Sequence, residues 1–358
     1  MFNFDYATLR LIGLTPAIAN QLHALASNFT EDHTLQAARI TEIHRDSLVL
    51  HNGNTLLQAR ALPRLLDDLK SEQSNLAVGD WGLFIGSPEN GYRFVARMPP
   101  LTHLARRNSK ERLQPLASNI DTALLVMGLD NDFNLRRLER YLALVHAAGV
   151  TPVVLLSKAD QHENAAARQA EVEQRLSANV PVFAINGLSL TNTDLLAPWM
   201  SAGQTLILLG SSGAGKSTLT NTLTNSAQKT NGVRAGDERG HHTTTSRSLH
   251  LCPGGACIID TPGLRSLQLN LDEEALSASF ADIDELAEAC QFRDCSHQSE
   301  PGCAVRIAVD EDRLKNYQKL LRESQRIQQT PLDKIAARAK WKVLVRSVKE
   351  RDSLKHPH

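Results

Sequence analysis

Short apolar runs separated by turn residues characterise the chain between about residues 35 and 97. Runs of this length predict β-strands, and the dipeptides Asn52-Gly53 and Asn90-Gly91 are typical of the tight turns that join them. The strand-like runs lie at 38–43, 47–50, 78–85 and 92–95. About five short strands in a segment of this size suit a small barrel, so we predict an OB-like β-barrel here.

A different pattern begins near residue 121, where almost continuous apolar runs alternate with helical periodicity. The predicted strands are 122–127, 152–156, 181–185 and 205–209, and the predicted helices are 135–148, 163–176, 216–223 and 273–289. A hairpin-like pair of strands is expected at 248–251 and 256–259. Apolar strands between helices predict a mostly parallel sheet covered on both faces, which places this part in the α/β class.

The segment 210–217 reads Gly-Ser-Ser-Gly-Ala-Gly-Lys-Ser and joins a predicted strand to a predicted helix. Strand, glycine-rich loop and helix in this order are what a phosphate-binding P-loop requires. Backbone N–H groups of such a loop surround phosphate oxygens, and the helix N-terminus adds partial positive charge. Lys216 is expected to reach the β- and γ-phosphates. The predicted nucleotide-binding residues here are Gly210, Ser211, Ser212, Gly213, Ala214, Gly215, Lys216, Ser217 and Thr218.

A second phosphate-site motif, Asp260-Thr261-Pro262-Gly263, follows the apolar run 256–259. In an Asp-x-x-Gly loop the aspartate holds Mg²⁺ and the Gly263 N–H meets the γ-phosphate. Between this loop and the P-loop lies the polar segment 240–245, which is typical of a switch loop and brings Thr243 and Thr244 to the nucleotide. The predicted Mg²⁺ ligands are Ser217, Thr244 and Asp260.

Base selection is predicted at Ser157, Lys158, Ala159 and Asp160, directly after the strand 152–156. The Asp160 carboxylate can accept hydrogen bonds from N1–H and N2–H₂ of guanine, a pair of donors that adenine does not offer. The Lys158 side chain can lie over the ring. An ordinary strand-to-helix turn has a similar composition, but the P-loop and the Asp-x-x-Gly loop favour a guanine nucleotide site.

Three of the five cysteines lie close together around a histidine. The candidate ligands are Cys290, Cys295, His297 and Cys303. Tetrahedral Zn²⁺ accepts a Cys₃His set, and four protein ligands leave no open position, so we expect one structural Zn²⁺. Cys252 and Cys257 flank a Pro-Gly-Gly turn and are interpreted as hairpin residues.

Composition narrows the class of protein. The 358 residues include 39 basic and 39 acidic side chains, so no global charge attracts the chain to a polyanion. The N-terminus does not resemble a signal peptide, and no apolar stretch approaches the ~20 residues that span a bilayer. Clustered rather than dispersed cysteines indicate a reducing compartment. We therefore expect a cytoplasmic protein.

Two basic stretches are the local candidates for contact with a polyanion. The first contains Arg106, Arg107, Lys110 and Arg112. The second, predicted to be helical, contains Lys334, Arg338, Lys340, Lys342, Arg346, Lys349, Arg351 and Lys355. A solvated face is the ordinary interpretation of either run, but a zinc module and a barrel beside the second favour contact with RNA phosphates.

The base-selecting segment precedes the P-loop here, which reverses the order found in common GTPases. Because the chain ends of compact domains often lie close together, a permuted order can preserve the same site. With the threonine run and the cysteine cluster, the chain resembles the circularly permuted, ribosome small-subunit-dependent GTPase A family (RsgA/YjeQ). The resemblance covers about residues 35–320.

The resemblance implies a GTP hydrolase that acts late in the maturation of the small (30S) ribosomal subunit. Such a protein binds 16S ribosomal RNA in its GTP form and leaves after hydrolysis. The bound groups implied are GTP or GDP, Mg²⁺ and one structural Zn²⁺. No DNA or membrane partner is expected, and the free protein is expected to be a monomer.

Catalysis is also predicted partly through the resemblance. Leu264 stands where many GTPases carry a water-orienting glutamine, and a leucine cannot orient water. The resemblance points instead to His242, which precedes the threonine run, as a water-orienting residue or general base. The predicted catalytic residues are therefore His242 and Lys216.

Three positions depart from the family pattern. Ser157 replaces the usual asparagine of the base-selecting segment, Asn186-Gly187 stands in place of a Ser-Ala pair, and His241 stands where arginine is frequent. These departures bear on the affinity for the base and on the link between the base pocket and the P-loop.

The resulting prediction is a multidomain protein. We expect an N-terminal extension at 1–34, the OB-like barrel at 35–98, a linker at 99–120, a circularly permuted GTPase domain at 121–268, and a zinc-binding, basic helical domain at 269–358. Two alternatives stay open at this point. One is a zinc- and barrel-based RNA-binding protein with a slow or inert nucleotide switch, and the other is a P-loop ATPase or kinase, which Asp160 disfavours.

Overall fold

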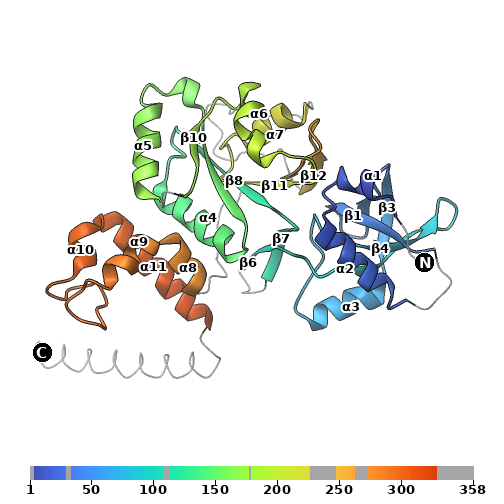
Figure 1. Cartoon of the computed structure of the whole chain (residues 1–358), viewed down its shortest axis with the longest axis horizontal. Helices are drawn as coiled ribbons and strands as arrows, with labels where there is room; N and C mark the ends of the chain where they lie inside the picture. The colour runs from blue at the N-terminus through green and yellow to red at the C-terminus, as the bar shows by residue number, and fades with distance from the viewer. Residues whose placement is uncertain are drawn as a thin grey trace, which may run out of the picture.

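The computed structural model describes residues 4–29, 34–107, 113–176, 179–225, 247–262 and 273–328. Figure 1 shows a β-barrel with its own helices, a central α/β unit, and a group of helices beside that unit. Eleven described strands form one hydrogen-bonded sheet in the order β10-β9-β8-β11-β13-β12-β1-β2-β3-β5-β4. The barrel and the α/β unit are therefore joined through β12 and β1, where Ser248 lies opposite Glu42.

The predicted OB-like barrel is confirmed. Its strands are β1 (Gln36–Ile43), β2 (Leu48–His51), β3 (Leu56–Ala61), β4 (Trp81–Ser87) and β5 (Gly91–Arg97). Pairing of β1 with β4 closes the barrel, and β3 lies parallel to β5 while the other pairs are antiparallel. Helix α3 (Pro63–Ser71) connects β3 to β4. Ile40, Leu50, Phe84 and Phe94 fill the interior without exposed surface.

Two helices precede the barrel, α1 (Tyr6–Arg10) and α2 (Pro16–Ala26). The Thr15 hydroxyl caps α2 by accepting a hydrogen bond from the Ile18 N–H at 3.3 Å, and proline at the first helical position has no N–H to leave unpaired. Leu22 of α2 packs in one buried cluster with Trp81 of β4. The described part of the predicted N-terminal extension is therefore helical and covers the barrel.

The stretch 99–120, predicted as a linker, contains regular structure. Strands β6 (His103–Arg107) and β7 (Leu113–Ser118) pair in antiparallel fashion as a separate two-stranded sheet. Leu104 and Leu116 are fully buried and share a cluster with the α/β unit. The prediction rested on the basic residues of this stretch and overlooked the burial of these two leucines.

The α/β unit is built on parallel strands. These are β8 (Thr122–Gly128), β9 (Thr151–Ser157), β10 (Val182–Ala184), β11 (Thr205–Leu209) and β13 (Cys257–Asp260), with β12 (Ser248–Leu251) antiparallel to β13. The connecting segments are α4 (Leu135–Ala147), η1 (Ala159–Gln161), α5 (Ala165–Arg175), α6 (Thr191–Leu196), η2 (Ala197–Trp199) and α7 (Lys216–Thr224). Leu125 packs on the α4 side of the sheet and Leu124 on the α7 side. Both faces are covered, as the apolar strands predicted.

The last described helices are α8 (Glu273–Ser279), α9 (Ala281–Ala287), α10 (Ala304–Ala308) and α11 (Glu311–Gln328). The helix predicted at 273–289 is thus two helices. Phe280 separates them with non-helical backbone angles, φ −132° and ψ 36°, and its ring is fully buried. A buried ring at the break ties the C-terminal helices to the core that they share with α4. None of the described helices is long and apolar enough to cross a membrane.

Candidate functional site

The carboxyl ends of the parallel strands bring the predicted nucleotide motifs to one edge of the sheet. Ser157 ends β9, the P-loop follows β11, and Asp260 ends β13. The Ser217 hydroxyl donates to Asp260 Oδ2 at 3.3 Å, and the Ser157 hydroxyl donates to the Ala214 carbonyl at 2.6 Å. Residues 57 and 43 positions apart in the chain therefore meet, and the permuted order leaves their arrangement intact.

The P-loop has the backbone that its glycines allow. Gly213 and Gly215 adopt positive φ values of 84° and 92°, which side-chain-bearing residues rarely accept. Lys216 Nζ donates to the carbonyls of Gly210 at 2.9 Å and Ser211 at 2.6 Å, so the ammonium group lies within the turn of the loop. Burial lowers the pKa of Lys216 to about 8, while Asp260 acts in the opposite direction.

Asp260 has the properties of a cation ligand. Its side chain is fully buried, burial raises its pKa, and its Oδ1 has no hydrogen-bond partner among the described residues. Its Oδ2 lies within hydrogen-bonding distance of the Ser217 hydroxyl. Since Mg²⁺ prefers carboxylate and hydroxyl oxygens, this pair of side chains fits a magnesium ion beside the P-loop.

The base-selecting segment occupies the turn after β9. Lys158 adopts a positive φ of 63°, and its Nζ donates to Asp130 Oδ2 at 2.6 Å. Ala159 donates its N–H to the Ile185 carbonyl at 3.1 Å, and Asp160 is exposed in η1. The carboxylate that would contact the base is therefore open to solvent on a turn held by its neighbours.

Two of the positions that depart from the family pattern, Ser157 and Gly187, form hydrogen bonds to the P-loop or to its helix. Although serine is shorter than asparagine, the Ser157 hydroxyl reaches the Ala214 carbonyl. The Gly187 carbonyl accepts a hydrogen bond from the Thr222 hydroxyl of α7 at 2.8 Å. The loops after β9 and β10 are thus both attached to the P-loop or to the helix that it begins.

Sequence reasoning missed two acidic residues at the same edge of the sheet. Asp130 and Asp132 lie in the loop between β8 and α4, where Asp130 binds Lys158 and Asp132 accepts from the Ser211 hydroxyl. Asp132 Oδ2 also accepts from the Gly128 N–H at 3.1 Å. Their position in the sequence could have indicated them, because they come shortly after the predicted strand 122–127, just as the base-selecting segment follows the strand 152–156.

Four predicted site residues lie outside the described part of the chain. They are the catalytic candidate His242, the switch threonines Thr243 and Thr244, and Gly263. Their roles remain predictions. Ser212 and Thr218 lie in the described P-loop and in α7, close to the residues discussed above.

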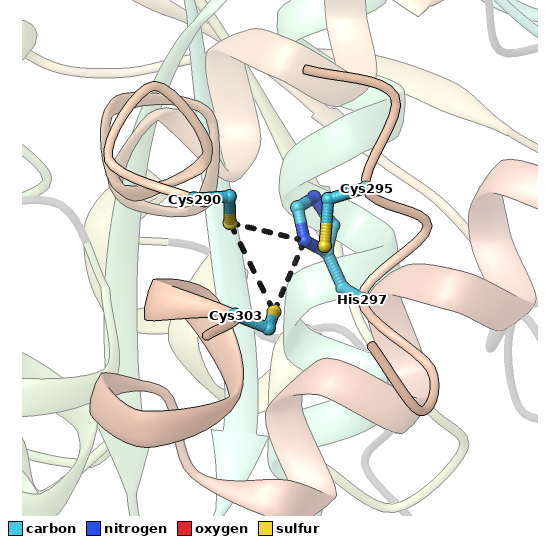
Figure 2. Close-up of side chains that lie close together, drawn as sticks. All are labelled: Cys290, Cys295, His297 and Cys303. Carbon is cyan, nitrogen blue, oxygen red and sulfur yellow. Dashed lines mark hydrogen bonds between the residues drawn. The ribbon is translucent and has the colours of Figure 1, made fainter. Parts of the chain in front are cut away.

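The cysteine cluster forms a four-ligand site (Figure 2). The ligand atoms of Cys290, Cys295, His297 and Cys303 all lie within 4.8 Å of one another. Cys303 Sγ is 3.4 Å from His297 Nδ1 and 3.9 Å from Cys290 Sγ. Sulfur ligands at ~2.3 Å from a tetrahedral zinc are ~3.8 Å apart, so this donor set is compatible with Zn²⁺. The His297 carbonyl accepts from Gln318 of α11 at 2.9 Å, which fastens the ligand loop to that helix.

Fold and site together define a circularly permuted P-loop GTPase. A model of the RsgA GTPase family matches residues 98–270. The small ribosomal subunit biogenesis GTPase RsgA of Xanthomonas oryzae pv. oryzae (strain MAFF 311018) is 43% identical over 325 residues, 88% of each chain. The protein of the same name from Xanthomonas axonopodis pv. citri (strain 306) is 42% identical over 328 residues, 89% of each chain. The chain belongs to the RsgA GTPase family, and the predicted resemblance is confirmed.

Solved structures agree on the fold. The crystal structure of YjeQ from Thermotoga maritima matches with a TM-score of 0.59 at 20% identity, over 81% of this chain and 99% of that one. YloQ, described as a circularly permuted GTPase, matches with a TM-score of 0.58 at 22% identity, over 84% and 99%. The order of motifs read from the sequence is thus the order of a known permuted fold.

Proposed function

We propose that this GTPase acts in the biogenesis of the small ribosomal subunit, with GTP bound at the edge formed by β9, β11 and β13. The main support for the nucleotide site is that the base-selecting segment, the P-loop and the Asp-x-x-Gly loop contact one another. Their contacts are made by Ser157, Ala214, Ser217 and Asp260. The ribosomal role is supported by relatives that bear this name and cover most of the chain.

Each described side chain has a distinct task in the proposed reaction. Lys216 neutralises charge on the β- and γ-phosphates, while Ser217 and Asp260 hold Mg²⁺, which would neutralise the same oxygens when bound. Asp160 reads the guanine edge. Among the residues predicted from sequence alone, Thr244 completes the Mg²⁺ ligands and His242 orients the attacking water.

The zinc site is proposed to be structural. Four protein ligands leave no position for a substrate, and none of the four contacts the P-loop residues described above. Zn²⁺ would cross-link the loop 290–303, which the hydrogen bond from Gln318 to the His297 carbonyl fastens to α11, and so stabilise the helical module (residues 273–328). We propose that this module and the barrel contact 16S ribosomal RNA, and that the protein is a cytoplasmic monomer when free.

The deciding experiment measures GTP turnover with and without purified small ribosomal subunits, using ATP and GDP as competitors. Strong stimulation by the subunits and exclusion of ATP are expected. Turnover that subunits do not change would contradict the ribosomal role, and equal use of ATP would contradict the assignment of Asp160 to the base.

A further inference from the structure

A cleft of about 1140 Å³ lies between the barrel and the β6–β7 hairpin, away from the nucleotide site. Its walls come from the turn between β1 and β2, from β3, from Leu66 of α3, from the segment before β4, from β7, and from Arg247 just before β12. A typical small-molecule pocket has about 300–1,000 Å³, so this opening suits part of a larger ligand. The cleft therefore lies where barrel and α/β unit meet.

Three guanidinium groups give the cleft a positive wall. Arg45, Arg60 and Arg247 line it from three different elements, and Asp46 is the acidic residue among the described lining. No ion pair with a described residue is found for these three arginines. Because the whole chain has a net charge of zero, this concentration of positive charge is local.

Arg247 is the most confined of the three. Its Nε is buried and has no hydrogen-bond partner among the described residues. Burial and the neighbouring Arg106 guanidinium lower its pKa to about 10, so it is charged at neutral pH. A buried donor beside a second positive charge is costly unless an anion approaches it. Arg247 therefore needs a partner that the described protein does not supply.

Phosphate is the anion that fits this wall best. Planar guanidinium groups bind phosphate oxygens in a bidentate manner. His44 is the one aromatic side chain in the described lining, too few for a row of stacked bases, so recognition would rely on the backbone rather than on the bases. We propose that the cleft binds the sugar-phosphate backbone of RNA, with Arg247 as its most buried phosphate contact.

The cleft lies at the junction between the barrel and the α/β unit. Arg247 directly precedes Ser248, which pairs with Glu42 of β1 at the junction between the barrel and the α/β sheet. RNA in the cleft would therefore contact both units at once. In the sequence, Arg247 also lies shortly after the segment that carries the predicted switch threonines. The inference rests on the proposed function and names where on this chain the subunit RNA is held.

The test replaces the cleft arginines one at a time, with Arg45→Gln, Arg60→Gln and Arg247→Gln. Arg64→Gln is the matched control, because Arg64 is exposed on the barrel helix α3 and does not line the cleft. Binding of small subunits and of purified 16S ribosomal RNA is measured over a range of KCl concentrations. Each cleft variant should bind several-fold more weakly, and the slope of log K against log salt should decrease by about 0.7–0.9. Basal GTP turnover and thermal unfolding should match the wild type.

The outcomes separate this proposal from the proposed function. If wild type and cleft variants bind subunits equally, with equal slopes, the cleft is not the RNA site while the ribosomal role stands. If the wild type does not bind subunits at all, the ribosomal role itself fails. If Arg64→Gln weakens binding as much as the cleft variants do, the effect comes from net charge alone. If the cleft variants bind subunits more weakly but bind purified RNA as the wild type does, the cleft contacts a protein. Either result overturns the proposal.

Discussion

At the scale of single residues, two buried opposite charges set the chemistry of the nucleotide site. Each of Lys216 and Asp260 favours the charged form of the other, although burial opposes both charges. Lys216 donates to two neutral carbonyls, those of Gly210 and Ser211, and among the described residues it donates to no carboxylate. Its positive charge is therefore left for a phosphate group.

We expect Lys216→Ala to weaken GTP binding by roughly 100-fold or more, because charge-assisted hydrogen bonds to phosphate are lost from a buried position. Titration with a fluorescent GTP analogue measures the affinity, and single-turnover assays measure hydrolysis. Equal turnover in variant and wild type would remove the P-loop from the reaction.

Asp160→Asn should change the base preference. An amide can donate to the 2-oxo group of xanthine but cannot accept both guanine donors, so guanosine affinity should fall and xanthosine affinity should rise. Competition between GTP and XTP measures the change. Glu163→Gln is the control, since Glu163 is a nearby exposed acid. An unchanged preference in Asp160→Asn would separate this segment from the base.

A third residue-scale feature is the buried carboxyl group of Asp80 in the barrel. It accepts hydrogen bonds from the Ser118 hydroxyl at 2.6 Å and the Ala77 N–H at 2.8 Å. Burial raises its pKa to about 6, although these bonds and the charges of Arg97 and Arg39 act in the opposite direction. Between about pH 4 and pH 6 the folded protein therefore binds more protons than the unfolded chain, so this group's contribution to stability is lost as pH rises.

Asp80→Asn should remove that pH dependence. The amide can accept from Ala77 and donate to the Ser118 oxygen, so the packing is kept without the buried charge. Relative to the variant, the free energy of unfolding of the wild type should fall by about 2 kcal/mol between pH 4 and pH 7. Urea unfolding at several pH values provides the measurement, and parallel curves for the two proteins would contradict the assignment.

At the scale of elements, the sequence predicted the strands well, because buried parallel strands are nearly continuous apolar runs. The strand 205–209 has the bounds expected, and β9 and β10 differ by one residue at each end. The break at Phe280 and the strands β6 and β7 could not be read in this way. Each depends on a tertiary contact, the burial of Phe280 in one case and of Leu104 and Leu116 in the other.

The grouping of the four candidate zinc ligands was predictable from their spacing in the sequence, and the role proposed for zinc is a property of the loop and helices around it. Cys303→Ser should lower the zinc content and destabilise the helical module, because metal binding supplies folding free energy to small loops. Stimulation by small subunits should be lost, while basal turnover should stay within about twofold of wild type because no ligand touches the nucleotide loops. Metal analysis and both turnover assays on one preparation measure this.

Cys252→Ser is the matched control for that experiment. Cys252 is buried in the hairpin of β12 and β13 and belongs to no ligand set among the described residues. The control should retain zinc. Loss of basal turnover in a folded Cys303→Ser protein would place the cluster in the active site, and unchanged stimulation after zinc loss would exclude a role in subunit contact.

At the scale of the whole molecule, contacts between distant segments fix the units relative to one another. The fully buried Arg39 of β1 donates to the Ile12 carbonyl at 2.7 Å, the Asn119 carbonyl at 2.9 Å and the Thr205 hydroxyl at 2.9 Å. One guanidinium therefore joins the N-terminal helices, the barrel, the segment after β7 and the α/β sheet. No sequence pattern indicates such a contact, because Arg39 and Thr205 are 166 residues apart.

The helical module is held by a second buried charge. Glu139 of α4 is 1% exposed. It accepts from Arg175 Nε at 2.9 Å, from Arg313 at 2.7 Å and from Asn316 at 2.5 Å, the last two on α11. The loop before α4 carries Asp132, which binds the P-loop serine Ser211. The loop before α4 thus contacts the P-loop, and α4 itself lies beside the helices of the helical module (Figure 1).

The Glu139 carboxylate is expected to hold α11 against α4. Glu139→Gln keeps the side-chain volume but removes the charge shared by Arg175 and Arg313, and breaking a buried ion pair costs about 3–5 kcal/mol. Hydrogen exchange should therefore increase in the helical module (residues 273–328), and stimulation by small subunits should decrease, while zinc is retained. Arg136→Gln is the control, because Arg136 and Asp312 are both about half exposed and such pairs contribute at most about 1 kcal/mol. Equal exchange in the two variants would mean that the apolar contacts with α4, rather than Glu139, hold the module in place.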